Sequence, residues 1–151
     1  MDKKQIAAFE RKVKGTIEKY DMISKGDKVL VACSGGKDST TTLYLLQKQG
    51  YKPEAISIDL HIGDYSKKNI ENVKGFCSKQ GIKLHLVDLR LEFGSSICYI
   101  REGIQGKKKL SNCTICGVVK RWILNKKAKE LHADKIATGH NLNDESETVL
   151  M

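Results

Sequence analysis

VLVACSGGKDSTTTLYLL, residues 29–46, changes from a strand pattern to a helix pattern at a pair of glycines. The run before the glycines is apolar and β-branched on both faces, which is typical of a buried parallel strand. The residues after Lys37 read as a helix that stops at Gly50. The corner differs from the common nucleotide P-loop, because Val31 stands where that loop needs its first glycine and Asp38 follows Lys37. The stretch therefore predicts a phosphate-binding turn of another kind.

The corner, Ser34–Ser39, combines several groups that bind anions. Gly35 and Gly36 allow backbone angles closed to other residues, and they let amide N–H groups come close to a phosphate. The N-terminus of the following helix points its dipole at the same place. Ser34 and Ser39 add hydroxyl donors, and Lys37 adds a positive charge. The structural alternative is a plain strand-to-helix turn whose helix is capped at Asp38 or Ser39.

Strand and helix patterns alternate along the whole chain. We expect strands over 28–33, 54–60, 83–88 and 134–138, and helices over 6–20, 38–49, 66–80, 119–131 and from 143 onward. Residues 89–112, rich in Gly, Ser and Lys, are expected to form an irregular, mobile loop. The alternation predicts an α/β fold with a doubly wound, Rossmann-like parallel sheet and helices on both faces. In the helix over 119–131, we expect Val119, Trp122, Ile123 and Leu131 to face inward.

Length and composition limit the class of protein. The chain has 151 residues, enough for one core, with 40% hydrophobic and 30% charged residues. We divide it into an N-terminal helical segment, 1–22, and a nucleotide-binding domain, 23–151, which we expect to be truncated at its C-terminus. There is no apolar run of the roughly 20 residues that span a bilayer, and no signal-peptide pattern, so we expect no membrane contact and a cytoplasmic location.

The net charge of +9 is concentrated in one zone. Residues 101–131 hold nine basic side chains against Glu102 and Glu130, a balance of +7. Such a zone attracts a polyanion such as a nucleic acid, although a solvated basic surface explains the composition equally well.

The five cysteines are expected to be thiols or metal ligands rather than disulfides. Cys113 and Cys116 form a C-x-x-C pair that can share one metal ion or cluster, but zinc needs four ligands and a four-iron cluster three or four. Cys98 is the candidate for a third ligand within the chain, Cys33 borders the glycine corner, and Cys77 is expected in the core. Two free thiols near a helix start are the alternative.

Taken together, four stretches carry a family resemblance: CSGGKDS, IDLHIGDYS, CTICGVVKR and IATGHNLNDESETVL. They resemble the PP-loop ATP pyrophosphatases in their tRNA 2-thiolation branch, and most of all the 2-thiouridine synthetases. The resemblance implies an adenine nucleotide alpha hydrolase-like fold whose loop holds the β- and γ-phosphates of ATP. It also implies that the C2 oxygen of a tRNA base is adenylated, with release of pyrophosphate, and is then replaced by sulfur.

The resemblance also implies cofactors and residue roles. ATP and Mg²⁺ are expected, together with a 4Fe-4S cluster on Cys113, Cys116 and a third cysteine further along the chain; zinc is the alternative metal. The catalytic residues would be Lys120, Asp38 and Asp144. We expect Lys120 in the first turn of its helix, where a cation is unfavourable without an anionic partner. The nucleotide would be bound by Ala32, Ser34, Gly35, Gly36, Lys37, Asp38, Ser39, Asp59 and Gly139.

The expected partners are tRNA and a sulfur donor, either sulfide or a sulfur-carrier protein, and a homodimer is an open possibility. Two other functions remain. One is a PP-loop tRNA ligase or amidase-type enzyme that uses an amine as nucleophile and has no need for the C-x-x-C pair. The other is a non-catalytic module that binds ATP or RNA without releasing pyrophosphate.

Overall fold

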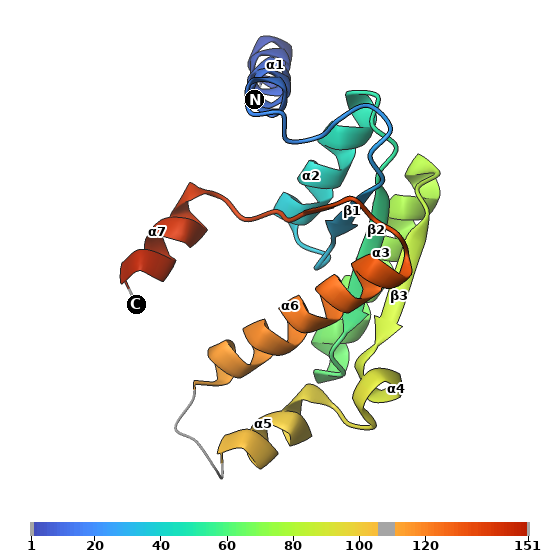
Figure 1. Ribbon diagram of the computed structural model, residues 1–151, viewed down its shortest axis with the longest axis vertical. Coiled ribbons are helices and arrows are strands. Elements are labelled where there is room, and N and C mark those ends of the chain that lie inside the picture. Colours follow the sequence, from blue (N-terminus) through green and yellow to red (C-terminus); the bar gives the residue numbers. More distant parts are fainter. Residues whose placement is uncertain (1, 106–110, 151) are drawn as a thin grey trace.

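The computed structural model describes residues 2–105 and 111–150, and its centre is a four-stranded parallel sheet (Figure 1). The strands are β1 (Val29–Ala32), β2 (Glu54–Asp59), β3 (Leu84–Asp88) and β4 (Lys135–Ala137), arranged in the order β3-β2-β1-β4. In the sheet, Ala32 pairs with Ile56, Asp59 with Asp88 and Val31 with Ala137. All four predicted strands are therefore present, and the predicted doubly wound parallel sheet is confirmed.

Each face of the sheet carries its own core. On one face, Val29 and Val31 pack with buried residues of α1 (Lys3–Lys19), α2 (Lys37–Lys48) and α3 (Gly63–Gln80). On the other face, Leu30 and Ile56 pack with α4 (Leu89–Phe93), α5 (Ile97–Gln105) and α6 (Asn112–Glu130). Successive side chains of a strand alternate between faces, so a strand covered on both sides must be apolar throughout. Cys77 lies in the first core, as predicted.

The prediction of an irregular loop over 89–112 is wrong for most of that segment. Residues 89–93 and 97–105 are helical, and Asp88 caps the first of these helices by accepting hydrogen bonds from the backbone of Arg90 and Leu91. Ile97 is fully buried in the second core, where Ile100 also packs. This apolar face stabilises α5 despite the surrounding Gly and Ser residues. Residues 106–110 lie outside the described chain.

Helix α6 begins earlier than predicted, at Asn112 instead of Val119. Ser111 caps it, because its side chain accepts a hydrogen bond from the backbone N–H of Thr114 at 3.1 Å. The expectation that Lys120 lies in the first turn is therefore wrong, since it lies beyond the second turn. Trp122, which was expected to face inward, is 50% exposed, whereas Ile123 is fully buried.

Three helices differ in detail from what the sequence predicts or lie partly apart from the sheet. Helix α3 begins at Gly63, three residues before its predicted start, and α7 (Leu142–Leu150) leads away from the sheet (Figure 1). Among the large apolar residues of α1, Ile17 is buried but Ile6 and Phe9 are exposed, and Tyr20, the residue that follows the helix, is exposed as well. No helix in residues 2–105 and 111–150 is long and apolar enough to cross a membrane.

Candidate active site

The strand order places a topological switch point between β1 and β4. The chain proceeds from β1 outward to β2 and β3 and then returns to the other side of β1, so the direction of winding reverses between β1 and β4. Ligands of doubly wound sheets bind at this switch point. β1 leads into the turn Ser34–Lys37, and β4 leads into Thr138–Asn141. The two sequence motifs predicted to bind the nucleotide therefore meet here.

Gly139 brings these two segments into contact. A Cβ atom on Gly139 would lie 2.6 Å from the backbone N of Ser39 and 2.8 Å from the backbone C of Asp38. Only glycine allows so close an approach. The loop after β4 therefore rests directly on the first turn of α2.

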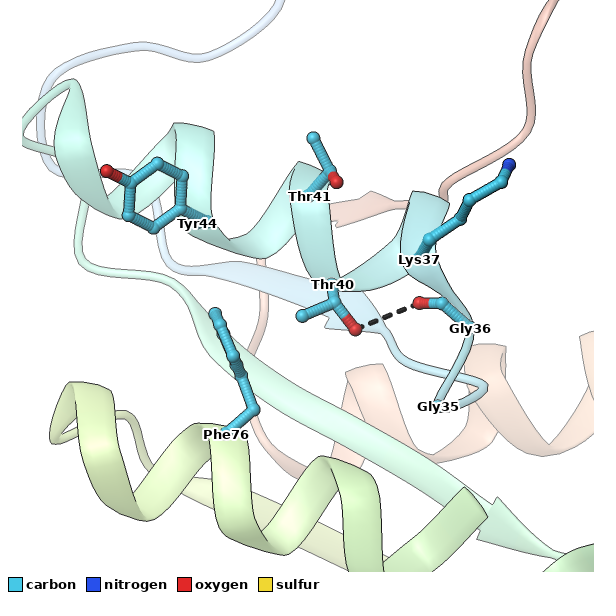
Figure 2. A pocket seen from close by; sticks show the side chains of 7 residues that line it. All are labelled: Gly35, Gly36, Lys37, Thr40, Thr41, Tyr44 and Phe76. Carbon is cyan, nitrogen blue, oxygen red and sulfur yellow. Dashed lines mark hydrogen bonds between the residues drawn. The ribbon is translucent and has the colours of Figure 1, made fainter. Parts of the chain in front are cut away.

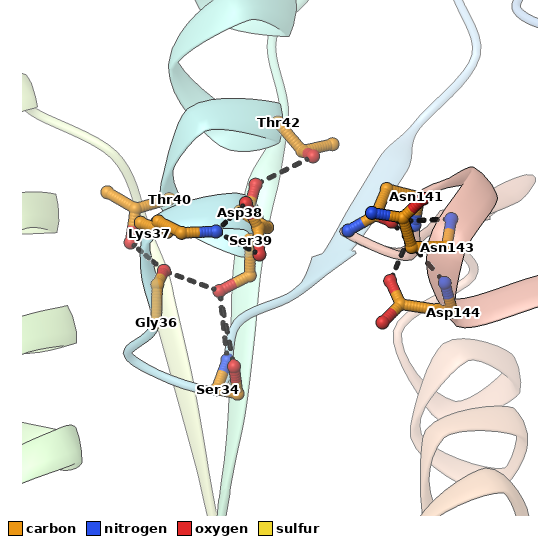
Figure 3. Close-up of polar contacts among 10 residues, drawn as sticks. All are labelled: Ser34, Gly36, Lys37, Asp38, Ser39, Thr40, Thr42, Asn141, Asn143 and Asp144. Carbon is orange, nitrogen blue, oxygen red and sulfur yellow. Dashed lines mark hydrogen bonds and ion pairs between the residues drawn. The ribbon is translucent and has the colours of Figure 1, made fainter. Parts of the chain in front are cut away.

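The turn after β1 is held rigidly by its neighbours. Gly35 has φ +83°, and a Cβ there would lie 2.7 Å from the backbone O of Asn69 in α3. The hydroxyl of Ser39 donates a hydrogen bond to the backbone O of Gly36 at 3.1 Å and accepts one from the backbone N–H of Ser34 at 3.3 Å (Figure 3). Ser39 is 5% exposed, so in this geometry it braces the turn from inside.

The N-terminus of α2 is left open toward solvent. Gly36 is its N-cap, and no side chain in the described part of the protein caps it, as is also the case for α3, whereas Asp2, Asp88 and Ser111 cap α1, α4 and α6. The first N–H groups of a helix need partners from outside it, and an anion is a suitable one. The alternative of a helix capped at Asp38 or Ser39 is therefore wrong.

Figure 3 shows Lys37 and Asp38 together at the start of α2, and Asp144 apart from them at the start of α7. The Nζ of exposed Lys37 lies 2.8 and 3.0 Å from the two carboxylate oxygens of Asp38. Asp38, with a smaller contribution from Asp144, raises the pKa of Lys37 above its usual value. Lys37 therefore stays positively charged, paired with Asp38 and influenced at longer range by Asp144.

The loop after β4 holds Asp144 in place. One carboxylate oxygen of Asp144 accepts a hydrogen bond from the backbone N–H of Asn141 at 2.7 Å. The side-chain oxygen of Asn141 accepts from the backbone N–H groups of Asn143 and Asp144. The Nδ1 of His140 lies 3.2 Å from the hydroxyl of Thr138, so this loop histidine is hydrogen-bonded.

The ends of β1 and β2 carry the remaining predicted nucleotide residues. Ala32 is partly buried, and Asp59 lies at the end of β2. Asp59 accepts a hydrogen bond from the backbone N–H of His61 at 2.9 Å, and the Nε2 of His61 lies 2.7 Å from Asp88. This hydrogen bond with His61 lowers the pKa of Asp88. Asp59 thus acts as a strand-end cap while lying at the edge where a ligand would bind.

Two hollows flank α2. One, of about 360 Å³, lies between α2 and α3 and includes Tyr44 and Phe76 (Figure 2). The other, of about 560 Å³, is mostly apolar, lies between α1, α2 and β4, and reaches Asp38 and Gly139. Neither is lined by Asp59, Lys120 or the C-x-x-C cysteines. The predicted site is therefore an open edge of the sheet rather than one closed cavity.

The two cysteines of the C-x-x-C pair lie in the first turns of α6. Cys113 is exposed and Cys116 is partly buried. Because residues three and four apart share a face of a helix, Cys113, Cys116 and Lys120 lie along one side of α6. The structure thus aligns the predicted metal ligands with the predicted catalytic lysine.

The pair supplies two ligands, fewer than zinc or a cluster needs. Among residues 2–105 and 111–150, no three His, Cys, Asp or Glu side chains are placed to hold a metal ion, so Cys98 is not brought to the pair. Burial raises the pKa of Cys33 to about 12 and also raises that of Cys77. These two thiols are poor ligands, because a thiolate is the binding form.

The basic zone divides into paired and unpaired charges. Lys126 and Lys127 form ion pairs with Glu92 of α4. Lys120, Arg121 and Lys129 are exposed and form no ion pair within the described chain. Lys107, Lys108 and Lys109 lie outside the described residues.

Sequence reasoning missed two residues that shape this site. The backbone of Asn69 packs directly against Gly35 in the turn, and His61 links the ends of β2 and β3. A backbone contact leaves no signal in the residue type, so Asn69 could not be predicted. His61 adopts a left-handed backbone conformation, with φ +55°. This conformation is uncommon for any residue other than glycine, so it could not be predicted from the presence of a histidine.

A parallel sheet whose first strand leads, at the switch point, into a helix start without a side-chain cap is typical of nucleotide-binding α/β domains. The sequence profile of the PP-loop domain matches residues 5–151, so the chain belongs to the PP-loop family. This assignment confirms the family resemblance carried by CSGGKDS.

Three known proteins are similar over nearly the whole chain. The tRNA-5-methyluridine(54) 2-sulfurtransferase of Pyrococcus horikoshii is 44% identical over 94% of this chain and 44% of its own length. The cytoplasmic tRNA 2-thiolation protein 1 of Malassezia globosa is 38% identical over 95% of this chain and 39% of its own. The structure of the U34-tRNA thiolase NcsA from Methanococcus maripaludis, solved with its [4Fe-4S] cluster, superposes with a TM-score of 0.81 at 30% identity, covering 97% of this chain and 48% of that one. The chain thus spans less than half the length of these relatives.

Proposed function

We propose that the protein is an ATP-dependent tRNA sulfurtransferase that replaces the C2 oxygen of a tRNA base with sulfur. The observation that carries the proposal is the contact of Gly139 with the first turn of α2. It joins the two halves of a nucleotide site around Lys37, Asp38 and Asp144. The names of the similar proteins, which include a 2-sulfurtransferase and a tRNA thiolase, support the reaction type.

In this proposal ATP is cleaved between its α- and β-phosphates, as the family resemblance implies. The β- and γ-phosphates would bind the open N–H groups of α2 and the turn Ser34–Lys37. Lys37 would then leave Asp38 and pair with these phosphates. The C2 oxygen of the base attacks the α-phosphorus, and the bond to the bridging oxygen breaks, with its electron pair leaving on pyrophosphate. Fixed donors around the leaving group stabilise that charge as it develops.

Lys120 and the carboxylates have distinct roles in this proposal. Lys120 is exposed on the side of α6 that carries the two thiols, and we assign it to the charge on the adenylated base. Asp38 and Asp144 would hold Mg²⁺, since carboxylate oxygens suit that ion. Bound Mg²⁺ neutralises phosphate charge. Ala32, Asp59 and Gly139 are proposed to line the adenosine, and Ser34, Gly35, Gly36 and Ser39 to shape the phosphate turn.

The C-x-x-C pair fits a shared metal site in part. Cys113 and Cys116 would supply two ligands of a 4Fe-4S cluster, and zinc remains the alternative metal. The part of the chain described here lacks the further ligands. In the second half of the reaction, a sulfur atom from the donor attacks C2 of the adenylated base, and the C–O bond breaks to release AMP.

Several wider assignments belong to the same proposal. The substrate would be tRNA, the sulfur donor sulfide or a carrier protein, and the location the cytoplasm, in line with the name of the Malassezia globosa relative. Residues 1–22 would form a helical segment beside the nucleotide domain, 23–151. A homodimer is compatible with this arrangement.

The proposal is tested by incubating the full-length protein, purified without oxygen, with ATP, Mg²⁺, sulfide and unmodified tRNA. We expect a thiolated nucleoside and pyrophosphate to form together, and mass spectrometry of the digested tRNA to identify the modified position. Pyrophosphate and an amine adduct without sulfur would favour the ligase alternative. Binding of ATP and tRNA without pyrophosphate would favour the non-catalytic module.

A further inference from the structure

An exposed pair of aromatic rings lies between α4 and α6. The ring centroids of Phe93 and Trp122 are 5.2 Å apart, with their planes tilted by 51°. Phe93 is 41% and Trp122 50% exposed, and Val118, one turn before Trp122, is exposed as well. Large apolar side chains gathered on a surface commonly mark an interaction site. We call Phe93, Val118 and Trp122 the ring patch.

A net positive charge lies beside the ring patch. The Nζ of Lys126 lies 5.4 Å from the centre of the Trp122 ring. Glu92, the acidic residue of α4, is neutralised by ion pairs with Lys126 and Lys127, and these hydrogen bonds lower its pKa. Helix α6 carries five basic residues and one acidic residue: Lys120, Arg121, Lys126, Lys127, Lys129 and Glu130. The rings therefore lie in a positive field.

We propose that the ring patch binds the tRNA substrate by stacking an unpaired base on Trp122. This inference rests on the proposed function and names a contact surface for its substrate. Aromatic side chains beside cations are the usual platform for single-stranded nucleic acid, because the rings stack on bases while the charges attract the phosphates. A basic helix beside exposed rings matches both parts of such a ligand.

The charge also argues against a second copy of the chain as the occupant. In a two-fold dimer the same patch faces itself, so this arrangement would place one strongly basic helix against another. Like charges brought together oppose association. A polyanion is attracted by the same charges.

The patch and the two thiols lie on different sides of α6. Trp122 follows Cys116 by six residues, so it lies about 9 Å further along the helix axis. It is also turned away from the side that carries Cys113 and Lys120. An RNA held at the patch would therefore run beside α6 without covering the two thiols.

Trp122 reports on this contact directly, because it is the only tryptophan in the chain. We expect its fluorescence to be quenched, in a saturable way, when an unmodified tRNA transcript is added to the full-length protein, provided that no further tryptophan lies outside residues 1–151. The quenching midpoint should agree with the Kd from the anisotropy of labelled tRNA. Trp122→Ala should weaken tRNA binding by about fivefold or more, the range for loss of one stacked base. Trp122→Phe should stay within about twofold, because it keeps a stacking ring.

A matched control is available on α1. Tyr20 is 65% exposed, and the Nζ of Lys19 lies 5.1 Å from its ring centre, so Tyr20→Ala removes a similar aromatic–cation pair at a distant place. We expect it to leave tRNA affinity unchanged. Lys129→Ala should reduce the slope of log affinity against log salt by about 1, whereas Trp122→Ala should lower affinity at an unchanged slope.

Three outcomes would overturn the proposal. Tight tRNA binding with no change in Trp122 fluorescence and no effect of Trp122→Ala would do so while leaving the proposed function intact. A change of oligomeric state in Trp122→Ala at unchanged tRNA affinity would identify the patch as a protein interface instead. Failure of the wild-type protein to bind tRNA at all would contradict both the patch and the proposed function.

Discussion

Gly35→Ala is expected to abolish ATP binding and to destabilise the protein. The left-handed φ of +83° costs a residue with a side chain about 1–2 kcal/mol. The added Cβ would also lie 2.7 Å from the backbone O of Asn69, and forced overpacking of this kind typically costs about 1–3 kcal/mol. Relief of the clash must move the phosphate turn away from α3, which misdirects the N–H groups that bind the anion. Calorimetric titration with ATP and thermal unfolding of the same samples measure both effects.

Two other glycines separate the causes of this effect. Gly50→Ala introduces a side chain at a similar φ of +90°, but nothing lies within 4 Å of the new atom, so it should lose only the strain energy and keep full ATP affinity. Gly36→Ala would meet nothing closer than the Ser34 hydroxyl at 3.6 Å, an ordinary contact. Normal ATP binding by Gly35→Ala would show that the turn does not grip the phosphates.

Cys113→Ser and Cys116→Ser are each expected to abolish thiolation while leaving ATP binding and pyrophosphate formation intact. The thiols lie on α6, whereas the adenylation chemistry is assigned to the turn after β1 and to the loop after β4. Changing a residue that only hydrogen-bonds to a metal ligand typically lowers activity ~10–100-fold. Changing a ligand itself should reduce the thiolated product by more than that. Nucleoside analysis and pyrophosphate release, measured on one reaction, separate the two halves of the mechanism, and iron and sulfide content should fall in parallel.

Cys98→Ser is the matched control for this pair. Cys98 lies in α5, partly buried, and it is not grouped with Cys113 and Cys116 as a metal site in the described chain. The Cys98→Ser variant should thiolate tRNA at close to the wild-type rate. If the wild-type protein and Cys113→Ser both released pyrophosphate and formed an amine adduct of tRNA without sulfur, a non-thiolating PP-loop ligase would be the better description.

The fold and the phosphate turn could be predicted because their signals are local. An apolar run, two glycines and a helical pattern specify strand, turn and helix within eighteen residues, 29–46. The alternation of strands and helices then requires a parallel sheet with covered faces. The resemblance to known enzymes placed Gly139 at the nucleotide, but its contact with the helix start of α2 was not predicted, since no local rule joins residues so far apart in sequence.

The errors concern features set by tertiary contacts. Helix α6 is capped by Ser111 and begins at Asn112, but position 114 holds threonine instead of the glutamate or glutamine that completes a capping box, so the start carried little signal. Residues 97–105 form a helix because Ile97 is buried against the sheet. The exposure of Trp122 depends on where α4 lies, and the helical period of α6 alone does not reveal it.

The central claim is that the turn after β1 grips the outer two phosphates of ATP and leaves the α-phosphorus open to attack. Its most direct test follows ATP labelled at the α-phosphate during a reaction with tRNA, Mg²⁺ and sulfide. The proposed mechanism predicts that labelled AMP forms together with an equal amount of pyrophosphate. Neither product should form with the Lys37→Met variant. Labelled ADP formed together with inorganic phosphate would contradict it.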